Sequence, residues 1–407
     1  MTARQAAYQV VLRVFEEDAY ADRVLRSAAK DLDSRDRALA QRLAFGTVQR
    51  ARTLDHAIDK LGKRPVRKLD PPVRAALRLG AYQLGYTDVP PHAAVNETVE
   101  LVRSARLERA VPFTNAVMRR LSEGLAPLLA ELPEDTPEAA ALKHSYPDWV
   151  AELWWEELGP EAALALMRAQ NEPPERVVRL NRRKSGQVEG RPDPDLPDAL
   201  HVERVDEEAL HAGLIWPQSR GSQLAGLVVG SRPGERTLDL CAAPGGKATQ
   251  LEGDVVAIEL HPGRARELEE NCRLLGADNV TVVNADATEL PPELTGFDRV
   301  LVDAPCSGLG VLAARPDLRW RARPLPELQA ELLRVAAERV KPGGTIVYSV
   351  CTMSLEENEA IVDASGLQVE PLGDEWPQFS HPRRPEFLLT QPHVHGTAGF
   401  FIARLRT

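Results

Sequence analysis

The spacing of apolar residues changes along this chain of 407 residues, and the change limits the folds that it can adopt. From residue 4 to about residue 130, apolar side chains recur every three or four positions, which is typical of amphipathic helices. From about residue 216 onward, short β-rich runs alternate with helical patterns, which is typical of a doubly wound parallel sheet. The sequence therefore predicts a helical domain followed by an α/β domain.

Proline and acidic residues indicate where these parts begin and end. Pro71-Pro72 and Pro90-Pro91 predict helix starts, because proline in a first helical turn gives up no hydrogen bond. The stretch 131–137 is rich in proline and acid and predicts a linker. We expect three domains: helical over residues 1–135, small α+β over 140–215, and α/β over 216–407.

The expected strands of the last domain lie in β-rich runs with helical patterns between them. The small subdomain is expected to contain a strand at Arg176–Leu180. The last run follows a long loop and is predicted to be an antiparallel edge strand, which makes the sheet mixed. The runs are Thr237–Leu240, Val255–Leu260, Val280–Asn284, Arg299–Asp303, Thr345–Val350 and Gly399–Leu405.

Charge is distributed unevenly between these regions. Residues 1–130 hold 22 Lys and Arg against 15 Asp and Glu, a net charge of +7, whereas the remainder carries −17. This asymmetry fits a basic module that docks a polyanion and is attached to an acidic catalytic body. The alternative is a solvated helical surface without a binding role. No apolar run approaches the roughly 20 residues that span a bilayer, so we expect a cytoplasmic protein without membrane contact.

The four cysteines are expected to be free thiols rather than metal ligands. Cys241, Cys272, Cys306 and Cys351 are far apart and form no paired metal-ligand spacing. In a reducing compartment, thiols are favoured over disulfides. We therefore expect no metal site, and we expect a monomer.

A glycine-rich turn follows the first strand of the α/β domain. Small residues over 239–247 let a ligand approach the backbone closely at the carboxyl end of the sheet. The spacing differs from that of the dinucleotide-binding turn. Glu259, Asp286 and Asp303 then follow three successive strands, so their carboxylates are expected in one crevice. This arrangement favours a nucleoside ligand with a positive centre and an amine, such as S-adenosylmethionine.

Two thiols are predicted to face the same crevice. Cys306 and Cys351 each come just beyond one of two neighbouring strands. An isolated cysteine is most often a small buried hydrophobic residue. Two cysteines at strand ends beside a cofactor turn favour a chemical role instead.

The α/β domain resembles the NOL1/NOP2/Sun family of RNA cytosine-5 methyltransferases. The N-terminal region is similar to the NusB-like RNA-binding domain, and the combination of the two is the RsmB type, so the resemblance covers nearly the whole chain. The segments that carry it are Asp239–Lys247, Asp303–Gly310, Arg315–Trp320 and Ser349–Glu359 in the α/β domain, and Arg35–Leu39, Leu43–Val48 and Pro90–Glu97 in the helical domain.

The resemblance implies a Rossmann-like methyltransferase domain with a mixed seven-stranded sheet and assigns roles to individual residues. Cys351 is the implied nucleophile, Cys306 assists release of the product, and Asp303 contacts the cofactor or the base. We hypothesise that Lys247 or an adjacent helix start favours the thiolate. The implied S-adenosylmethionine contacts are Cys241, Ala242, Ala243, Pro244, Gly245, Gly246, Lys247, Glu259, Asp286 and Asp303.

The implied substrate is RNA, and the RsmB type modifies 16S ribosomal RNA, either free or in a small-subunit assembly particle. The target base has to leave its stack, which favours an exposed nucleotide. A DNA cytosine methyltransferase would share the chemistry, but Cys351 and the NusB-like domain favour RNA. A noncatalytic assembly factor is disfavoured because both cysteines and every cofactor acid are retained.

Glu259 departs slightly from the family pattern, since aspartate is common there, and two further positions depart more clearly. Ser219 and Ala398 each stand where the family usually has aspartate. Neither is a predicted catalytic residue, so the departures concern accessory contacts of the cofactor or RNA pocket.

Overall fold

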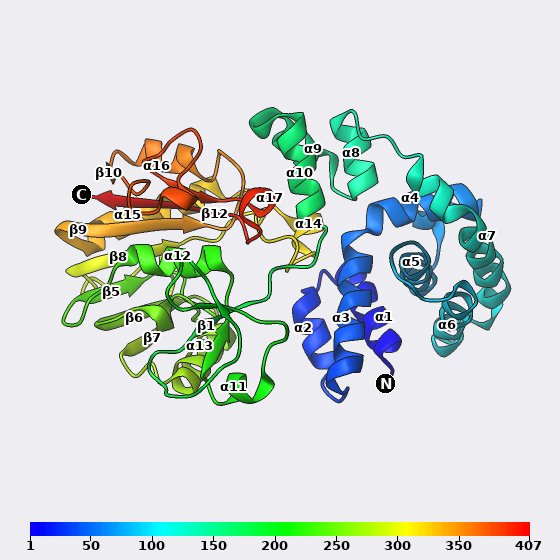
Figure 1. Cartoon of the computed structure of the whole chain (residues 1–407), viewed down its shortest axis with the longest axis horizontal. Coiled ribbons are helices and arrows are strands. Elements are labelled where there is room, and N and C mark those ends of the chain that lie inside the picture. The colour runs from blue at the N-terminus through cyan, green and yellow to red at the C-terminus, as the bar shows by residue number, and fades with distance from the viewer. The chain divides into compact units, whose positions relative to one another are not determined.

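The computed structural model describes residues 1–407 and divides into two compact units (Figure 1). The first unit comprises residues 1–171 together with residues 312–321. The second comprises residues 172–311 and 322–407. No helix in the structure combines the length and the apolar character needed to cross a bilayer.

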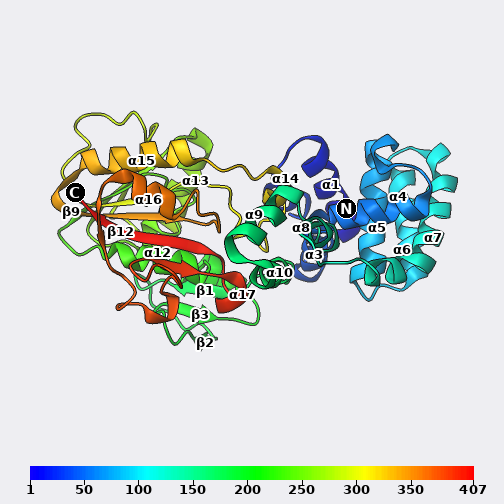
Figure 2. The ribbon, with the colours of Figure 1, turned by 90° about the horizontal axis from the view of Figure 1, so that it is seen from above.

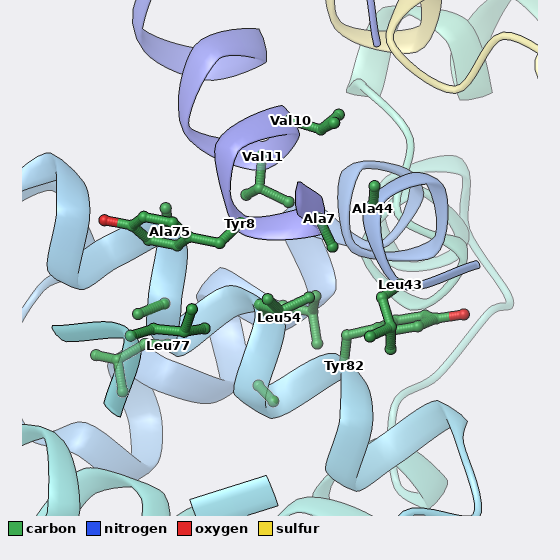
Figure 3. Close-up of a cluster of buried hydrophobic side chains, with 14 of the residues drawn as sticks. Ala7, Tyr8, Val10, Val11, Leu43, Ala44, Leu54, Ala75, Leu77 and Tyr82 are labelled. Atoms are coloured by element: carbon green, nitrogen blue, oxygen red, sulfur yellow. The ribbon is translucent and has the colours of Figure 1, made fainter. Parts of the chain in front are cut away.

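The first unit is entirely helical. Its core lies mainly between α1, α3, α4, α5 and α7, and Figure 3 shows Tyr8, Val11, Leu43 and Leu77 pointing into it. The expected proline starts are confirmed, because α5 begins at Pro71 and α6 at Pro91. The helices are α1 (Ala3–Glu16), α2 (Ala21–Ala28), α3 (Ser34–Gln49), α4 (Ala51–Gly62), η1 (Val66–Lys68), α5 (Pro71–Tyr86), α6 (Pro91–Ser104), η2 (Glu108–Ala110), α7 (Val111–Ala130), α8 (Pro137–His144), α9 (Asp148–Leu158), α10 (Pro160–Ala169) and α14 (Leu318–Arg321).

The second unit contains two sheets. A four-stranded antiparallel sheet has the order β2-β3-β1-β4, and its strands are β1 (Val177–Leu180), β2 (Arg191–Pro192), β3 (Ala199–His201) and β4 (Ile215–Pro217). The larger, mixed sheet has the order β10-β12-β9-β8-β5-β6-β7, with β11 paired to β12. Its strands are β5 (Arg236–Asp239), β6 (Asp254–Glu259), β7 (Val280–Asn284), β8 (Phe297–Asp303), β9 (Val340–Val350), β10 (Gln368–Glu370), β11 (Leu388–Thr390) and β12 (Phe400–Arg406).

Helices cover both faces of the larger sheet. Figure 2 shows α15 (Pro326–Arg339) and α12 (Arg220–Val229) on opposite sides of it. The apolar face of α12 packs against β8, β9 and β12. The remaining helices of this unit are α11 (Glu207–His211), η3 (Ala248–Gln250), α13 (Pro262–Leu275), α16 (Glu359–Ser365), η4 (Pro377–Phe379) and α17 (Pro392–His395).

The fold class is confirmed, but the last strand is not an edge strand as expected. β12 pairs antiparallel with β9 on one side and with β10 and β11 on the other. The two short strands lie in the segment before β12 that was predicted to be a loop. With three residues each, they are too short to show an alternating pattern of hydrophobic residues.

The compact units also divide the chain elsewhere than at the expected boundaries. Helices α8 to α10, which were expected in a subdomain over 140–215, belong to the first unit. Polar contacts attach α8 to α4, since Thr53 Oγ1 donates to the carbonyl of Leu142 at 2.6 Å and Ser145 Oγ accepts from the backbone N–H of Arg52 at 3.0 Å. The strands β1 to β4 belong to the second unit.

Residues 312–321 form the second difference. This segment follows the Cys306 loop in sequence but packs in the helical unit, where the Arg319 side chain is fully buried. Arg319 Nη1 donates to the carbonyls of Gln49 and Ser145 and to Asn171 Oδ1, at 2.9 to 3.0 Å. Trp320 Nε1 donates to the carbonyl of Val48 at 2.7 Å, so this side chain has a packing role.

Candidate functional site

The site lies at the carboxyl ends of the parallel strands. β5 ends at Asp239, β6 at Glu259 and β8 at Asp303, while Asp286 comes two residues after β7 and Cys351 directly after β9. These five strands run parallel to one another, so their carboxyl ends share one edge of the sheet. The predicted convergence of acids and thiols follows from this topology.

The glycine-rich turn after β5 presents backbone at this edge. Gly245 has φ +106°, which side-chain-bearing residues rarely adopt, and a side chain at Gly246 would be crowded by Trp216. Two side chains of α13 fix the backbone of the turn. Arg264 Nη2 and Asn271 Nδ2 donate to the carbonyls of Ala243 and Pro244, respectively, each at 2.8 Å. A fixed, open backbone of this kind suits close approach of a ligand.

The acids retain capacity for further hydrogen bonds. Glu259 accepts from the N–H of His261 at 2.8 Å, and Asp286 Oδ1 accepts from both the N–H and the hydroxyl of Thr288. These bonds from Thr288 lower the pKa of Asp286 and keep it ionised. Asp303 Oδ2 lies 2.7 Å from Lys247 Nζ. Carboxylates at neighbouring strand ends fit the hydroxyl and amine groups of a nucleoside cofactor.

Asp239 was not among the expected ligand residues, but its environment is the most unusual in the site. It is fully buried, and Oδ2 has no hydrogen-bond partner. Burial, and secondarily the charge of Asp303, raises its pKa to about 7. A buried acceptor without a partner fits a ligand that carries a hydrogen-bond donor. The sequence does carry a signal for Asp239, since it ends its strand as Glu259 and Asp303 end theirs.

The two expected thiols are brought together. Cys306 Sγ and Cys351 Sγ lie 3.4 Å apart and share a hydrogen bond, and both residues are partly exposed. All four cysteines are free, as predicted. Cys272 is a buried residue of α13, and Cys241 lies in the glycine-rich turn.

The pair is electrostatically unequal. The hydrogen bond from Cys306 is the main cause of a lowered pKa at Cys351, and Lys247 lowers it further against the opposing effects of burial and Asp303. The pKa of Cys306 is raised by that same bond, by burial and by the charges of Cys351 and Glu357. The hypothesis that Lys247 favours the thiolate therefore identifies a secondary cause. The suggested helix start is wrong, because α16 begins only at Glu359.

Two backbone segments cross next to Cys351. Gly310 N–H donates to the carbonyl of Cys351 at 2.9 Å, and Gly399 N–H donates to the carbonyl of Gly310 at 2.8 Å. A Cβ on Gly310 would lie 2.2 Å from the Gly399 oxygen, so neither chain could approach with a side chain there. Ala398 precedes this crossing, and its carbonyl accepts from Thr390 Oγ1. Its backbone supports the loop, and its methyl side chain packs against the apolar core.

Ser219, the other departure from the family pattern, has a structural role. It is the N-cap of α12, where its hydroxyl accepts from the N–H of Ser222 at 3.3 Å. Serine and aspartate are about equally good N-caps, so the exchange keeps this function.

The comparisons with known proteins agree with this architecture. A family model described as "16S rRNA methyltransferase RsmB/F" matches residues 227–406, and one described as "NusB family" matches residues 1–123. The crystal structure of PH0851 superposes with a TM-score of 0.83 at 24% identity, covering 100% of this chain and 99% of that one. This likeness shows the fold.

Relatives are similar over most or all of their length. A protein of Bacillus subtilis (strain 168), "Probable ribosomal RNA small subunit methyltransferase B", is 31% identical and covers 100% of this chain and 98% of its own. "Ribosomal RNA small subunit methyltransferase B" of Salmonella paratyphi B is 34% identical over 87% of each chain. The chain therefore belongs to the RsmB family of S-adenosylmethionine-dependent methyltransferases.

Proposed function

We propose that this protein methylates carbon 5 of a cytosine in 16S ribosomal RNA, with Cys351 as covalent nucleophile and Cys306 as the group that assists its release. The observation that carries the proposal is the pair of thiols 3.4 Å apart at the strand edge that holds the glycine-rich turn. The printed names of the relatives support the ribosomal RNA substrate. The opposite pKa shifts of the two thiols, lowered at Cys351 and raised at Cys306, support the division of roles.

Carbon 5 of cytosine is too weak a nucleophile to be methylated unaided. The Cys351 thiolate adds to carbon 6, and a C–S bond forms while electron density moves onto carbon 5 and the base edge. S-adenosylmethionine, when bound, supplies a methyl group on a positively charged sulfur. After methylation, a base such as a water molecule takes up the carbon-5 proton, the electron pair of that C–H bond re-forms the C5=C6 double bond, and the C–S bond breaks, which restores the nucleobase and the thiolate. Cys306 Sγ lies 3.4 Å from Cys351 Sγ, so its S–H group can stabilise the departing thiolate by a hydrogen bond.

The cofactor roles are proposed from the acids' positions. Glu259 would accept from the ribose hydroxyls and Asp286 from the adenine, because Asp286 Oδ2 has no hydrogen bond and Glu259 Oε2 meets only Arg264, at 3.5 Å. Asp239 and Asp303 would face the methionine amine. The backbone over 241–247 would lie against the rest of the cofactor, since Gly245 and Gly246 leave that face of the turn open.

The helical unit is proposed to dock RNA through a basic surface at the end of α4. We call Lys60, Lys63, Arg64, Arg67 and Lys68 the 60–68 surface; all five side chains are exposed, and none forms an ion pair. Arg120 of α7 lies beside it, since its Nη2 donates to the carbonyl of Gly62 at 3.2 Å. Unpaired cations on one face attract phosphates without reading sequence.

The cysteine roles are tested by two substitutions. Cys351→Ala lacks the attacking thiol, so we expect no methyl transfer and no covalent RNA adduct. Cys306→Ala retains the nucleophile but not the assisting group, so the enzyme should accumulate as an RNA adduct that survives denaturing electrophoresis. Transfer of labelled methyl groups to matched RNA and DNA oligomers gives the activity and the substrate class.

The matched control is Cys272→Ala, which removes a buried thiol outside the strand edge and should leave activity near wild type. An adduct in Cys351→Ala rather than Cys306→Ala would reverse the two roles. Full activity of Cys351→Ala would refute the covalent mechanism. RNA binding by the wild-type protein without methyl transfer would indicate a noncatalytic assembly factor.

A further inference from the structure

Glu357 is a buried carboxylate beneath the thiol pair to which no role has yet been given. Its side chain is fully buried and has no cationic partner. Instead it accepts hydrogen bonds from the N–H of Ser307 at 3.0 Å, the N–H of Leu325 at 3.1 Å and Gln329 Nε2 at 2.9 Å. A buried charge held only by neutral donors is unusual, because burial without a counter-ion is costly.

These contacts fix the backbone on both sides of Cys306. Ser307 is held directly by Glu357, and the carbonyl of Pro305 accepts from Gln329 Nε2 at 2.9 Å. On the other strand end, Ser307 Oγ and Thr352 Oγ1 share a hydrogen bond at 2.7 Å. The network therefore ties the residue after Cys306 to the residue after Cys351, and it sets the separation of the two sulfur atoms.

The charges around the pair differ from one thiol to the other. The groups that face Cys351 are Cys306, Asp303 and Lys247, and the last two form an ion pair with each other. Cys306 faces Cys351 and Glu357 and has no cation among its neighbours. Tyr348 also adjoins Cys306 and Glu357, and burial raises its pKa, so it is neutral. The negative charge of Glu357 beside Cys306 therefore has no cation near it, whereas the negative charge of Asp303 beside Cys351 is paired with Lys247.

We propose that Glu357 is a positioning residue that holds Cys306 beside Cys351, and that its negative charge keeps the shared proton on Cys306 so that Cys351 is the thiolate. This assignment rests on the proposed function, in which Cys351 attacks the base. It explains how two chemically identical thiols acquire different roles before RNA binds. Cys306 then donates its S–H to the Cys351 sulfur.

The test is the reactivity of each thiol toward iodoacetamide as a function of pH, with the labelled cysteine located by mass spectrometry of peptides. Glu357→Gln keeps the shape and one acceptor oxygen but removes the charge. We expect the pH midpoint for labelling Cys306 to fall by about one unit and the preference for Cys351 over Cys306 to fall about tenfold. Glu357→Asp keeps the charge but shortens the reach. It should keep the labelling preference, while kcat for methyl transfer falls and KM for RNA does not change.

Glu359→Gln is the matched control. It neutralises another buried glutamate two residues away, which pairs with His381 rather than with the Cys306 loop, so labelling should stay as in wild type. An unchanged labelling preference in folded Glu357→Gln overturns the proposal, as does a lost preference in folded Glu357→Asp. The labelling needs neither RNA nor cofactor. A wild-type enzyme that makes no 5-methylcytosine would therefore refute the proposed function without altering this result.

Discussion

Each of the two units buries a charged side chain, and the two charges are treated differently. In the helical unit, both terminal nitrogens of Arg319 are hydrogen-bonded, and burial lowers its pKa only to about 10, so the side chain stays charged at neutral pH. In the sheet unit, Asp239 keeps one oxygen without a partner, and its pKa is raised to about 7. Although Arg319 Nε has no partner, the bonds of the two terminal nitrogens hold the side chain as a permanent anchor. The carboxylate of Asp239 is the unsaturated charge, and we propose that its unpartnered oxygen receives a ligand.

Breaking the anchor should have the largest effect. Arg319→Met keeps the length of the side chain but removes its donors, which leaves the buried carbonyls of Gln49 and Ser145 and Asn171 Oδ1 short of a partner. We expect a loss of about 3 kcal/mol or more in the stability of the helical unit. Urea unfolding followed by circular dichroism measures this. Arg13→Gln, which breaks only an exposed pair with Glu17, should unfold near the wild-type midpoint. Equal midpoints for the two variants would show that Arg319 is not an anchor.

Neutralising Asp239 should stabilise the free protein, whereas removing the charge of Arg319 should destabilise it. The pKa of Asp239 is higher in the folded protein than in the unfolded chain, so the folded state binds more protons between about pH 4 and pH 7. The contribution of this carboxyl to stability therefore falls as pH rises through that window. Asp239→Asn should remove the decline and stabilise the free protein at pH 8 by on the order of 2 kcal/mol, since the full shift corresponds to about 4 kcal/mol.

The same substitution should weaken S-adenosylmethionine binding, because the acceptor for the ligand is lost. Isothermal titration calorimetry measures the affinity, and thermal unfolding at several pH values measures the stability. Glu259→Ala combined with Asp286→Ala provides the comparison, as it should weaken the cofactor without the pH-dependent stabilisation. If Asp239→Asn bound cofactor as tightly as wild type, Asp239 would not be part of the site.

The smallest predicted effect is on RNA binding, and it concerns the positively charged surface of the helical unit. Lys60→Gln, Lys63→Gln and Lys68→Gln together should weaken RNA binding about tenfold and reduce the salt dependence of binding by about two counterions, with cofactor affinity unchanged. Arg13→Gln, Arg103→Gln and Lys143→Gln remove equal charge from ion-paired positions and serve as the control. The measurement is the RNA affinity at several salt concentrations. Equal losses of affinity in the two triple variants would mean that the 60–68 surface has no special role in RNA binding. Deleting residues 1–135 is a poorer test, because Arg319 and Trp320 would lose partners.

The sequence predicted what depends on local pattern. Strand ends and helix starts follow from periodicity and proline, and parallel strands with their ends at one edge imply that Cys306 and Cys351 approach each other. The position of residues 312–321 could not be predicted, because Arg319 donates mostly to backbone carbonyls, which carry no sequence signal. Glu357 was hidden for the same reason, since two of its three donors are backbone N–H groups. Ser219 shows the converse: it departs from the family pattern, yet its side chain still caps α12.

The membership of residues 312–321 in the helical unit has a consequence for protein synthesis. A ribosome emits residues 1–171 first, but that unit lacks its last ten residues until 150 more have been added. At roughly 5–20 residues per second, the helical unit waits about 8–30 s for the segment that carries Arg319. Until then the acceptors around Gln49 and Ser145 remain without this donor. The nascent helical unit is therefore completed only after the Cys306 loop has been translated.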